Sequence, residues 1–494
     1  MHWIDLTIFG LYMVAMLGFG FFFLKRNEGA DDYYVGGRNM SSLHVGLSVV
    51  ATDVGGGFSI GLGGLGFVMG ISGSWMLFTG LLGAWMAAVL LIPKVKGNSA
   101  FDKAYTFPEV FKHYFNPHVA LVAGIISAVG YAGFTSSQIL AGAKLATGTF
   151  ANLDLQTALI IMGSVAVLYT VMGGLKAVIY TDTVQWAILM VGLIFIGIPI
   201  SYVEIGGWEA ISQTVDPALL SMGNLTWQKV VYWAVTILPI WFVGMTLYQR
   251  IYACSDEKTA KRAWYLAGLF EWPVMAFMGV SLGLFAKVGA AQGMFEYLGA
   301  PSVAETDPET GLPMLLRTVL PVGLMGIMMS AYFSAILSTA DSCLMAASGN
   351  VVSDIIGYFK EIDHDSDTFL RFSQITTLVI GVVALLIATT MNNVLQLMLK
   401  SYAFMVSGLF VPIIGALFWK KSSSVGAIAA MILGGATTVS LGIFMDELPA
   451  GLDANVFGIA TSLVVFVGLS LAFPDEPRNE SRMKDTQNIN ATAE

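Results

Sequence analysis

The chain has 494 residues, of which 56% are hydrophobic and only 12% are charged. Soluble domains carry about 25% charged residues, so most of this surface does not face water, and the net charge of −9 indicates neither nucleic acid nor an acidic partner. Two cysteines, no spaced metal ligands and no phosphate-binding loop argue against a disulfide framework, a metal site, an ATP-driven pump and an enzyme.

Apolar runs long enough to cross the roughly 30 Å hydrocarbon core of a bilayer recur along the whole chain. They predict an all-α polytopic membrane protein with thirteen transmembrane helices, at 5–24, 42–70, 74–95, 118–146, 155–173, 177–203, 229–249, 263–288, 313–346, 370–391, 394–418, 424–445 and 454–473. The first run precedes Lys25 and Arg26, which is not the order of a signal peptide.

The basic residues indicate an orientation. Most of them, including Arg250, fall in segments that lie inside if the amino terminus is outside. Because short inner loops of membrane proteins are enriched in lysine and arginine, we expect an outer amino terminus and a cytosolic carboxyl terminus in the plasma (inner) membrane. The polar tail 474–494 is predicted to be disordered.

The second span breaks the rule that a membrane helix is uniformly apolar. Asp53 is followed by three consecutive glycines, Gly55, Gly56 and Gly57. Glycine weakens a helix by about 1 kcal/mol relative to alanine, and irregular backbone at membrane depth is tolerated where it lines a site. We therefore predict a broken helix whose carbonyl groups face a binding site; a glycine-rich packing face is the alternative.

Polar side chains also interrupt later spans. Asp182 lies in the first turn of the sixth span, where it is either a functional carboxylate or a helix-end residue. In the eighth span Pro273 is expected to kink the helix, beside Glu271, whose role stays open. One face of the ninth span carries oxygen atoms suited to a hard cation, or to bonds between helices: Ser334, Ser338, Asp341 and Ser342, with Thr339 beside them.

Several local motifs in this order resemble the sodium–solute symporter family over essentially the whole chain. They are Asp31-Asp-Tyr-Tyr-Val-Gly-Gly-Arg38, Thr106-Phe-Pro-Glu-Val-Phe, Thr181-Asp182-Thr183 and Ser338-Thr339-Ala-Asp341-Ser342. The resemblance implies a core of two inverted five-helix repeats, 41–203 and 204–422. A peripheral first helix (1–40) and two peripheral helices (423–473) would flank this core.

The resemblance also implies where ions bind. The family's sodium site would use the carbonyl groups of Ala51, Val54 and Ala335 and the hydroxyl groups of Ser338 and Thr339. A second cation or coupling site would use Asp182, Asp341 and Ser342. A carboxylate at position 341 departs from the family pattern, so either a cation or a shared proton would separate the two aspartates. Sodium is the expected coupling ion, with a proton as the alternative.

The solute is less well defined by the resemblance. Its pocket would be lined by Asp53, Gly55, Gly56, Gly57, Phe58 and Trp241. Asp53 is similar to the proline branch, the glycines to the choline branch, and Phe58 replaces a glutamine of the sugar branch. We expect a symporter for an amino acid or related carboxylate working by alternating access. The alternatives are a choline-like quaternary amine held by the aromatic rings of Trp75, Trp85, Tyr131 and Trp241, or an uncoupled facilitator.

Overall fold

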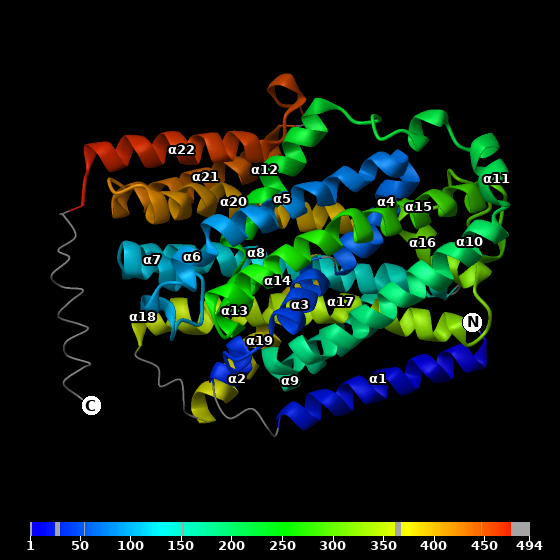
Figure 1. The fold of residues 1–494 in the computed structure, drawn as a ribbon, viewed down its shortest axis with the longest axis horizontal. Coiled ribbons are helices and arrows are strands. Elements are labelled where there is room, and N and C mark those ends of the chain that lie inside the picture. Colours follow the sequence, from blue (N-terminus) through cyan, green and yellow to red (C-terminus); the bar gives the residue numbers. More distant parts are fainter. Residues whose placement is uncertain are drawn as a thin grey trace.

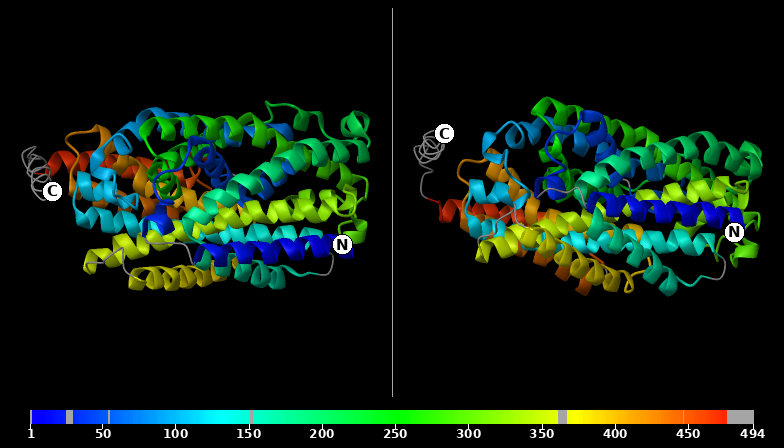
Figure 2. Two further views of the ribbon diagram at one scale, coloured as in Figure 1. Left: turned by 60° about the horizontal axis from the view of Figure 1, so that its bottom comes forward. Right: turned by 90° about the horizontal axis from the view of Figure 1, so that it is seen from below.

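The computed structural model describes residues 2–24, 30–53, 55–150, 153–360, 367–445 and 447–475. Within these residues the secondary structure consists of helices without a β-strand, so the predicted all-α class is confirmed. The long helices lie side by side along the longest axis of the molecule (Figure 1). The beginning of α1 and the end of α22 lie at opposite ends of this axis in all views (Figure 2).

The first half of the chain forms the helices α1 Trp3–Leu24, α2 Ala30–Val35, α3 Ser42–Asp53, α4 Gly56–Met69, η1 Gly70–Ser74, α5 Trp75–Leu90, α6 Ile92–Val95, η2 Ser99–Phe101, α7 Pro108–Tyr114, α8 Pro117–Thr149, α9 Leu155–Gly192, η3 Leu193–Gly197, α10 Ile198–Glu204, α11 Gly207–Thr214 and η4 Pro217–Leu220. The second half forms α12 Trp227–Val243, α13 Met245–Ala253, α14 Glu257–Leu269, η5 Phe270–Met275, α15 Ala276–Ala291, η6 Glu296–Leu298, α16 Pro308–Val319, α17 Leu324–Gly349, η7 Asn350–Ile356, α18 Gly357–Phe359, α19 Asp367–Ala388, α20 Val394–Phe418, α21 Ser424–Phe444, η8 Pro449–Gly451 and α22 Ala454–Ala472.

Polar residues begin many of the long helices. An N-cap side chain accepts a hydrogen bond from a free amide of the first turn, which satisfies a donor that the helix itself leaves open. Side chains of this kind precede α8, α9, α12, α14, α16, α20, α21 and α22: Asn116, Asp154, Thr226, Asp256, Asp307, Asn393, Ser423 and Asp453.

The described residues contain ten helical segments long and apolar enough to cross a membrane, or eleven if the bent pair α12–α13 is one span. The predicted number of thirteen is not confirmed. Residues 60–95, expected to belong to two spans, form one continuous helical segment, and α1 and α3 contribute shorter apolar stretches. The predicted fifth and sixth spans, by contrast, match two separate candidate spans, Leu155–Met172 and Val178–Glu204, although α9 runs without interruption from the first into the second.

The predicted ninth span is wrong at its start. Residues 313–319 belong to the separate helix α16, and α17 begins only at Leu324. Gly323, which precedes α17, has a φ of 90°, a conformation that favours glycine and ends helical geometry. Asp5 of α1 then accepts hydrogen bonds from the amides of Gly323 (2.7 Å) and Gly326 (3.0 Å) and so stabilises the start of α17.

Helix α17 forms the centre of the bundle. It is buried almost throughout its length and packs against α8 and α9. The predicted kink in the eighth span is confirmed at η5, where Trp272 has non-helical dihedral angles immediately before Pro273. The amino-terminal helix α1 and the carboxyl-terminal pair α21 and α22 lie on opposite sides of the bundle in Figure 1. The central helix α17 carries several buried polar side chains, among them Ser338, Thr339 and Asp341.

Candidate functional site

The chain is broken between α3 and α4, as the glycine run predicts. α3 ends at Asp53, and α4 begins at Gly56 after Gly55, which acts as its N-cap. A Cβ atom at Gly55 would lie 1.8 Å from Oγ1 of Thr339 on α17, so this close approach requires glycine. The break thus leaves the last carbonyl groups of α3 without helical partners, directly beside α17.

Four predicted sodium ligands, here called the neutral cluster, come together at this break: Ala51, Ala335, Ser338 and Thr339. The Oγ1 atom of Thr339 donates to the carbonyl oxygens of Ala51 (3.0 Å) and Ala335 (3.1 Å). Ser338 also donates to the Ala335 carbonyl group (3.2 Å). All four residues are buried. The fifth predicted ligand, Val54, lies outside the described residues.

Next to this cluster lies a second group of polar residues, here called the charged cluster: Ser48, Thr52, Asp182, Arg250, Asp341 and Ser342. Its centre is the fully buried guanidinium group of Arg250 on α13, which is 3.5 Å from the Asp182 carboxylate. The same guanidinium group donates to Ser48 (3.0 Å), Thr52 (2.5 Å) and Ser342 (2.9 Å). It therefore connects α3, α9 and α17 through hydrogen bonds and one ion pair.

Arg250 was not predicted as a site residue but was expected in an inner segment; its side chain is completely buried. The charge of Arg250 could have indicated a functional role, since a charged residue within an apolar span is a functional candidate by default. It follows the bend of 42° between α12 and α13, at Gly244. This second broken span was not predicted either, although Pro239 and Gly244 are both helix-weakening residues.

The two carboxylates of the charged cluster have different partners. Oδ2 of Asp182 accepts a hydrogen bond from Ser48 (2.5 Å), whereas Oδ1 of Asp341 accepts one from Thr170. The remaining oxygens, Oδ1 of Asp182 and Oδ2 of Asp341, have no hydrogen-bond partner among the described residues. The two carboxylates interact electrostatically, and Asp182 is the one that forms an ion pair with Arg250.

The predicted solute-pocket residues are not all brought together. Gly56 lies where a Cβ atom would meet Ala141 (2.6 Å) and Ile336 (2.7 Å), on α8 and α17. Trp241 is buried against Gly83 of α5 and Trp264 of α14 instead. The described contacts therefore do not join Gly56 to Trp241. Gly57 lies in α4, while the side chains of Asp53 and Phe58 fall outside the description.

The aromatic side chains considered for a quaternary amine do not form one box. Trp85 is 42% exposed and donates to the carbonyl group of Tyr265 (3.2 Å). Trp75 donates to the carbonyl group of Met222 (3.0 Å). Tyr131 instead bonds Thr246 at the start of α13 (3.1 Å). Their positions favour structural roles over joint recognition of one cation.

Comparison with known proteins identifies the family. The family model described as the sodium:solute symporter family matches residues 33–434. The chain belongs to this family. The matched region covers more than half of the chain. It contains the helix break and both clusters described above. The symporter spans a membrane several times and uses Na+ as its coupling ion to move a small solute.

Relatives of similar length support this assignment. The symporter is 27% identical to the osmoregulated proline transporter OpuE of Bacillus subtilis, over 92% of its own chain and 94% of the relative. It is 28% identical to the high-affinity proline transporter PutP of the same organism, over 93% and 98%. The sodium/proline symporter of Escherichia coli is 26% identical, over 88% and 87%.

A solved structure shares the fold. A Na+-coupled sialic acid symporter superimposes with a TM-score of 0.77 at 20% identity, over 96% of this chain and 99% of the other. MHP1, a nucleobase-cation-symport-1 family transporter, gives a TM-score of 0.58 at 12% identity, over 93% and 99%. These likenesses establish a transporter fold.

Proposed function

We propose that the symporter imports an amino acid or a related small carboxylate together with sodium, by alternating access around its two broken spans. The relatives of similar length are proline transporters, which supports this class of solute. In secondary transporters, broken helices in corresponding positions of two repeats mark the binding site. The breaks at Gly55 and Gly244 fit the proposed repeats 41–203 and 204–422.

The observation that carries the proposal is the contact between Thr339 and the broken end of α3. Carbonyl and hydroxyl oxygens without formal charge suit a small monovalent cation, because they replace its water ligands at little electrostatic cost. We assign the sodium site to the neutral cluster together with the carbonyl group of Val54. The charged cluster would supply nearby negative charge without coordinating this ion directly.

The orientation remains part of the proposal. An outer amino terminus would place α7, α18 and the end of α22 on the cytosolic side of the plasma (inner) membrane. This assignment rests on the distribution of basic residues along the chain. Opposite positions of the first and last described helix ends in Figure 1 fit termini on opposite sides of the bilayer.

The test is uptake into proteoliposomes, with and without a sodium gradient, of radiolabelled L-proline, other amino acids, a sugar and choline. We expect sodium-driven uptake of an amino acid. In Thr339→Ala the sodium concentration for half-maximal uptake should rise about tenfold or more, because a ligand bond to an ion is worth roughly 1.5–3 kcal/mol.

A matched control is Thr377→Ala on α19. This variant removes a buried hydroxyl group that donates to a carbonyl group of its own helix, Ser373 (2.8 Å). The control should retain the sodium dependence of the unmodified protein. Unchanged sodium dependence in Thr339→Ala would exclude this location for the sodium site. Sodium-driven uptake of choline alone would instead overturn the solute class.

A further inference from the structure

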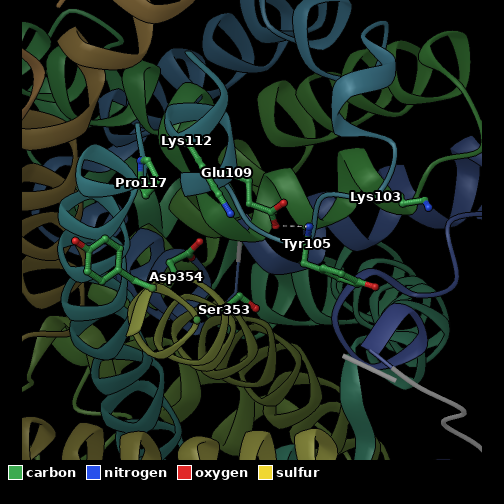
Figure 3. A pocket seen from close by; sticks show the side chains of 10 residues that line it. Lys103, Tyr105, Glu109, Lys112, Pro117, Ser353 and Asp354 are labelled. Atoms are coloured by element: carbon green, nitrogen blue, oxygen red, sulfur yellow. Dashed lines mark hydrogen bonds between the residues drawn. The ribbon is translucent and has the colours of Figure 1, made fainter. Parts of the chain in front are cut away.

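A cavity of about 260 Å³ lies away from the broken helices. Its lining comes from α7, the preceding loop, the start of α8 and the helical turns η7 and α18 (Figure 3). We call it the Asp354 cavity; it is lined by Lys103, Tyr105, Glu109, Lys112, Ser353 and Asp354, among others. Thr339 lies on α17 and Asp354 on η7, which continues α17 directly. At a helical rise of 1.5 Å per residue, the two positions are about 22 Å apart along the helix axis. The cavity is thus separate from the proposed sodium site.

The floor of this cavity presents oxygen atoms that lack donors. Asp354 is 8% exposed, and its Oδ1 accepts a hydrogen bond from Thr106 (2.7 Å). Its Oδ2 and the hydroxyl group of Ser353 have no hydrogen-bond partner within the described chain. Buried acceptors left without a donor are costly, so these two oxygens favour a ligand that carries N–H or O–H groups.

The position of Asp354 is imposed by close packing. A Cβ atom at Gly124 of α8 would lie 2.7 Å from Cβ of Asp354, so the two helices approach closely at this point. On the opposite wall, Oε1 of Glu109 accepts from the amides of Tyr105 (2.8 Å) and Thr106 (3.1 Å). Burial raises the pKa of Glu109 above its usual range, although these amides oppose the shift.

A positive charge completes the cavity. The ammonium end of Lys112 lies between the labelled side chains of Glu109 and Asp354 in Figure 3, and it interacts electrostatically with both carboxyl groups. Lys112 is exposed and forms no ion pair with a described side chain. A bare cation would be repelled by Lys112, and a bare anion would be repelled by Asp354.

We propose that the Asp354 cavity is a second solute site, which binds the ammonium and carboxylate groups of an α-amino acid. The ammonium group would donate to Oδ2 of Asp354 and to Ser353, while the carboxylate would pair with Lys112. Charge-assisted bonds of this kind are stronger than neutral ones. This inference rests on the proposed class of solute but not on the proposed sodium site.

Equilibrium binding to the purified full-length symporter tests this site, using radiolabelled L-proline in sodium buffer and in potassium buffer. We expect two classes of site in sodium, of which only the Asp354 cavity remains in potassium. Asp354→Asn keeps the acceptor for Thr106 but removes the charge. It should weaken the sodium-independent class about tenfold or more, as should Lys112→Gln.

Two controls sharpen the result. Asp102→Asn and Lys258→Gln make the same chemical changes at exposed positions outside the cavity lining, and both should leave the two classes unchanged. N,N-dimethyl-L-proline retains the carboxylate but has no N–H group, so it should compete at least about tenfold more weakly than L-proline for the sodium-independent class.

The outcomes separate the two proposals. A single, sodium-dependent class of L-proline sites that is unaffected by Asp354→Asn would overturn the second site and preserve the proposed function. A sodium-independent class that is lost in Asp354→Asn, without any sodium-dependent class, would do the opposite. If Asp354→Asn fails to elute as a folded protein on size exclusion, Lys112→Gln and Ser353→Ala decide the question, because unchanged affinity in both would overturn the site.

Discussion

Two polar clusters lie within one turn of each other on α17, and they differ in charge. The neutral cluster combines the hydroxyl groups of Ser338 and Thr339 with backbone carbonyl groups. The charged cluster already contains a cation, the guanidinium group of Arg250, which contacts Asp182 and Ser342. The proposed site for a mobile sodium ion thus lies beside a cluster that carries a covalently attached cation.

The two clusters also differ in how their polar groups are paired. In the neutral cluster the hydroxyl group of Thr339 donates to the carbonyl oxygens of Ala51 and Ala335. In the charged cluster neither ionic partner can leave, because removal of one partner of a buried pair costs roughly 3–5 kcal/mol. We therefore expect stability to depend mainly on Arg250 and sodium affinity mainly on Thr339.

The largest effect should follow from Arg250→Gln, which leaves the buried Asp182 carboxylate without its counter-charge. We expect a loss of about 3–5 kcal/mol in stability, measured as a lower midpoint of thermal unfolding in detergent. The double variant Arg250→Gln/Asp182→Asn removes both charges and should recover most of this loss. Arg262→Gln, at an exposed position, serves as the control. An Arg250→Gln midpoint equal to that of the control would refute the assignment of stability to this cluster.

A smaller but more local effect is expected from Gly55→Ala. The added Cβ atom would lie 1.8 Å from Oγ1 of Thr339, so α4 and α17 must separate. Overpacking of this kind typically costs roughly 1–3 kcal/mol, and it should raise the half-maximal sodium concentration with little loss of folded protein. Gly468→Ala, where the added atom meets nothing within 4 Å, should behave like the unmodified symporter. Equal sodium dependence in the two variants would show that the break can relax.

The elements of the site that could be predicted were those with a local signal. Consecutive glycines located the break at Gly55, a proline located the kink at Pro273, and the spacing of oxygen-bearing side chains placed Ser338 on a polar face of α17 with Thr339 beside it. Each of these signals acts within a few residues of itself, through helix propensity or helical periodicity.

The contacts that depend on distant segments could not be predicted. Arg250 and Glu309 resemble residues of polar segments when only their neighbours in sequence are considered. In the folded chain Arg250 bonds Ser48 and Ser342, whereas Glu309 pairs with Lys144 (2.8 Å) and accepts hydrogen bonds from the first amides of α20. Burial of a charge depends on which partner the tertiary fold supplies, and one sequence does not contain that information.

The remaining expected effect concerns Asp341, the second acidic residue of the charged cluster. Two ionised carboxylates and one arginine would leave a buried negative charge, which a second sodium ion or a proton between Asp182 and Asp341 would remove. A second sodium ion gives a Hill coefficient above one, which should fall toward one in Asp341→Asn. A proton instead gives a coefficient of one, with accumulation that depends on the pH gradient.

The accumulation ratio distinguishes these cases quantitatively. One sodium ion moving down 100 mV supplies about 2.3 kcal/mol, and a tenfold gradient adds about 1.4 kcal/mol. One ion therefore supports roughly 500-fold accumulation of a neutral solute, and two ions support roughly the square of that ratio. Steady-state uptake into proteoliposomes at a fixed potential should thus drop toward roughly 500-fold in Asp341→Asn if a second sodium ion binds there. If the unmodified symporter has a coefficient of one, ignores the pH gradient and shares its ratio with Asp341→Asn, Asp341 is a structural residue and a single sodium ion drives transport.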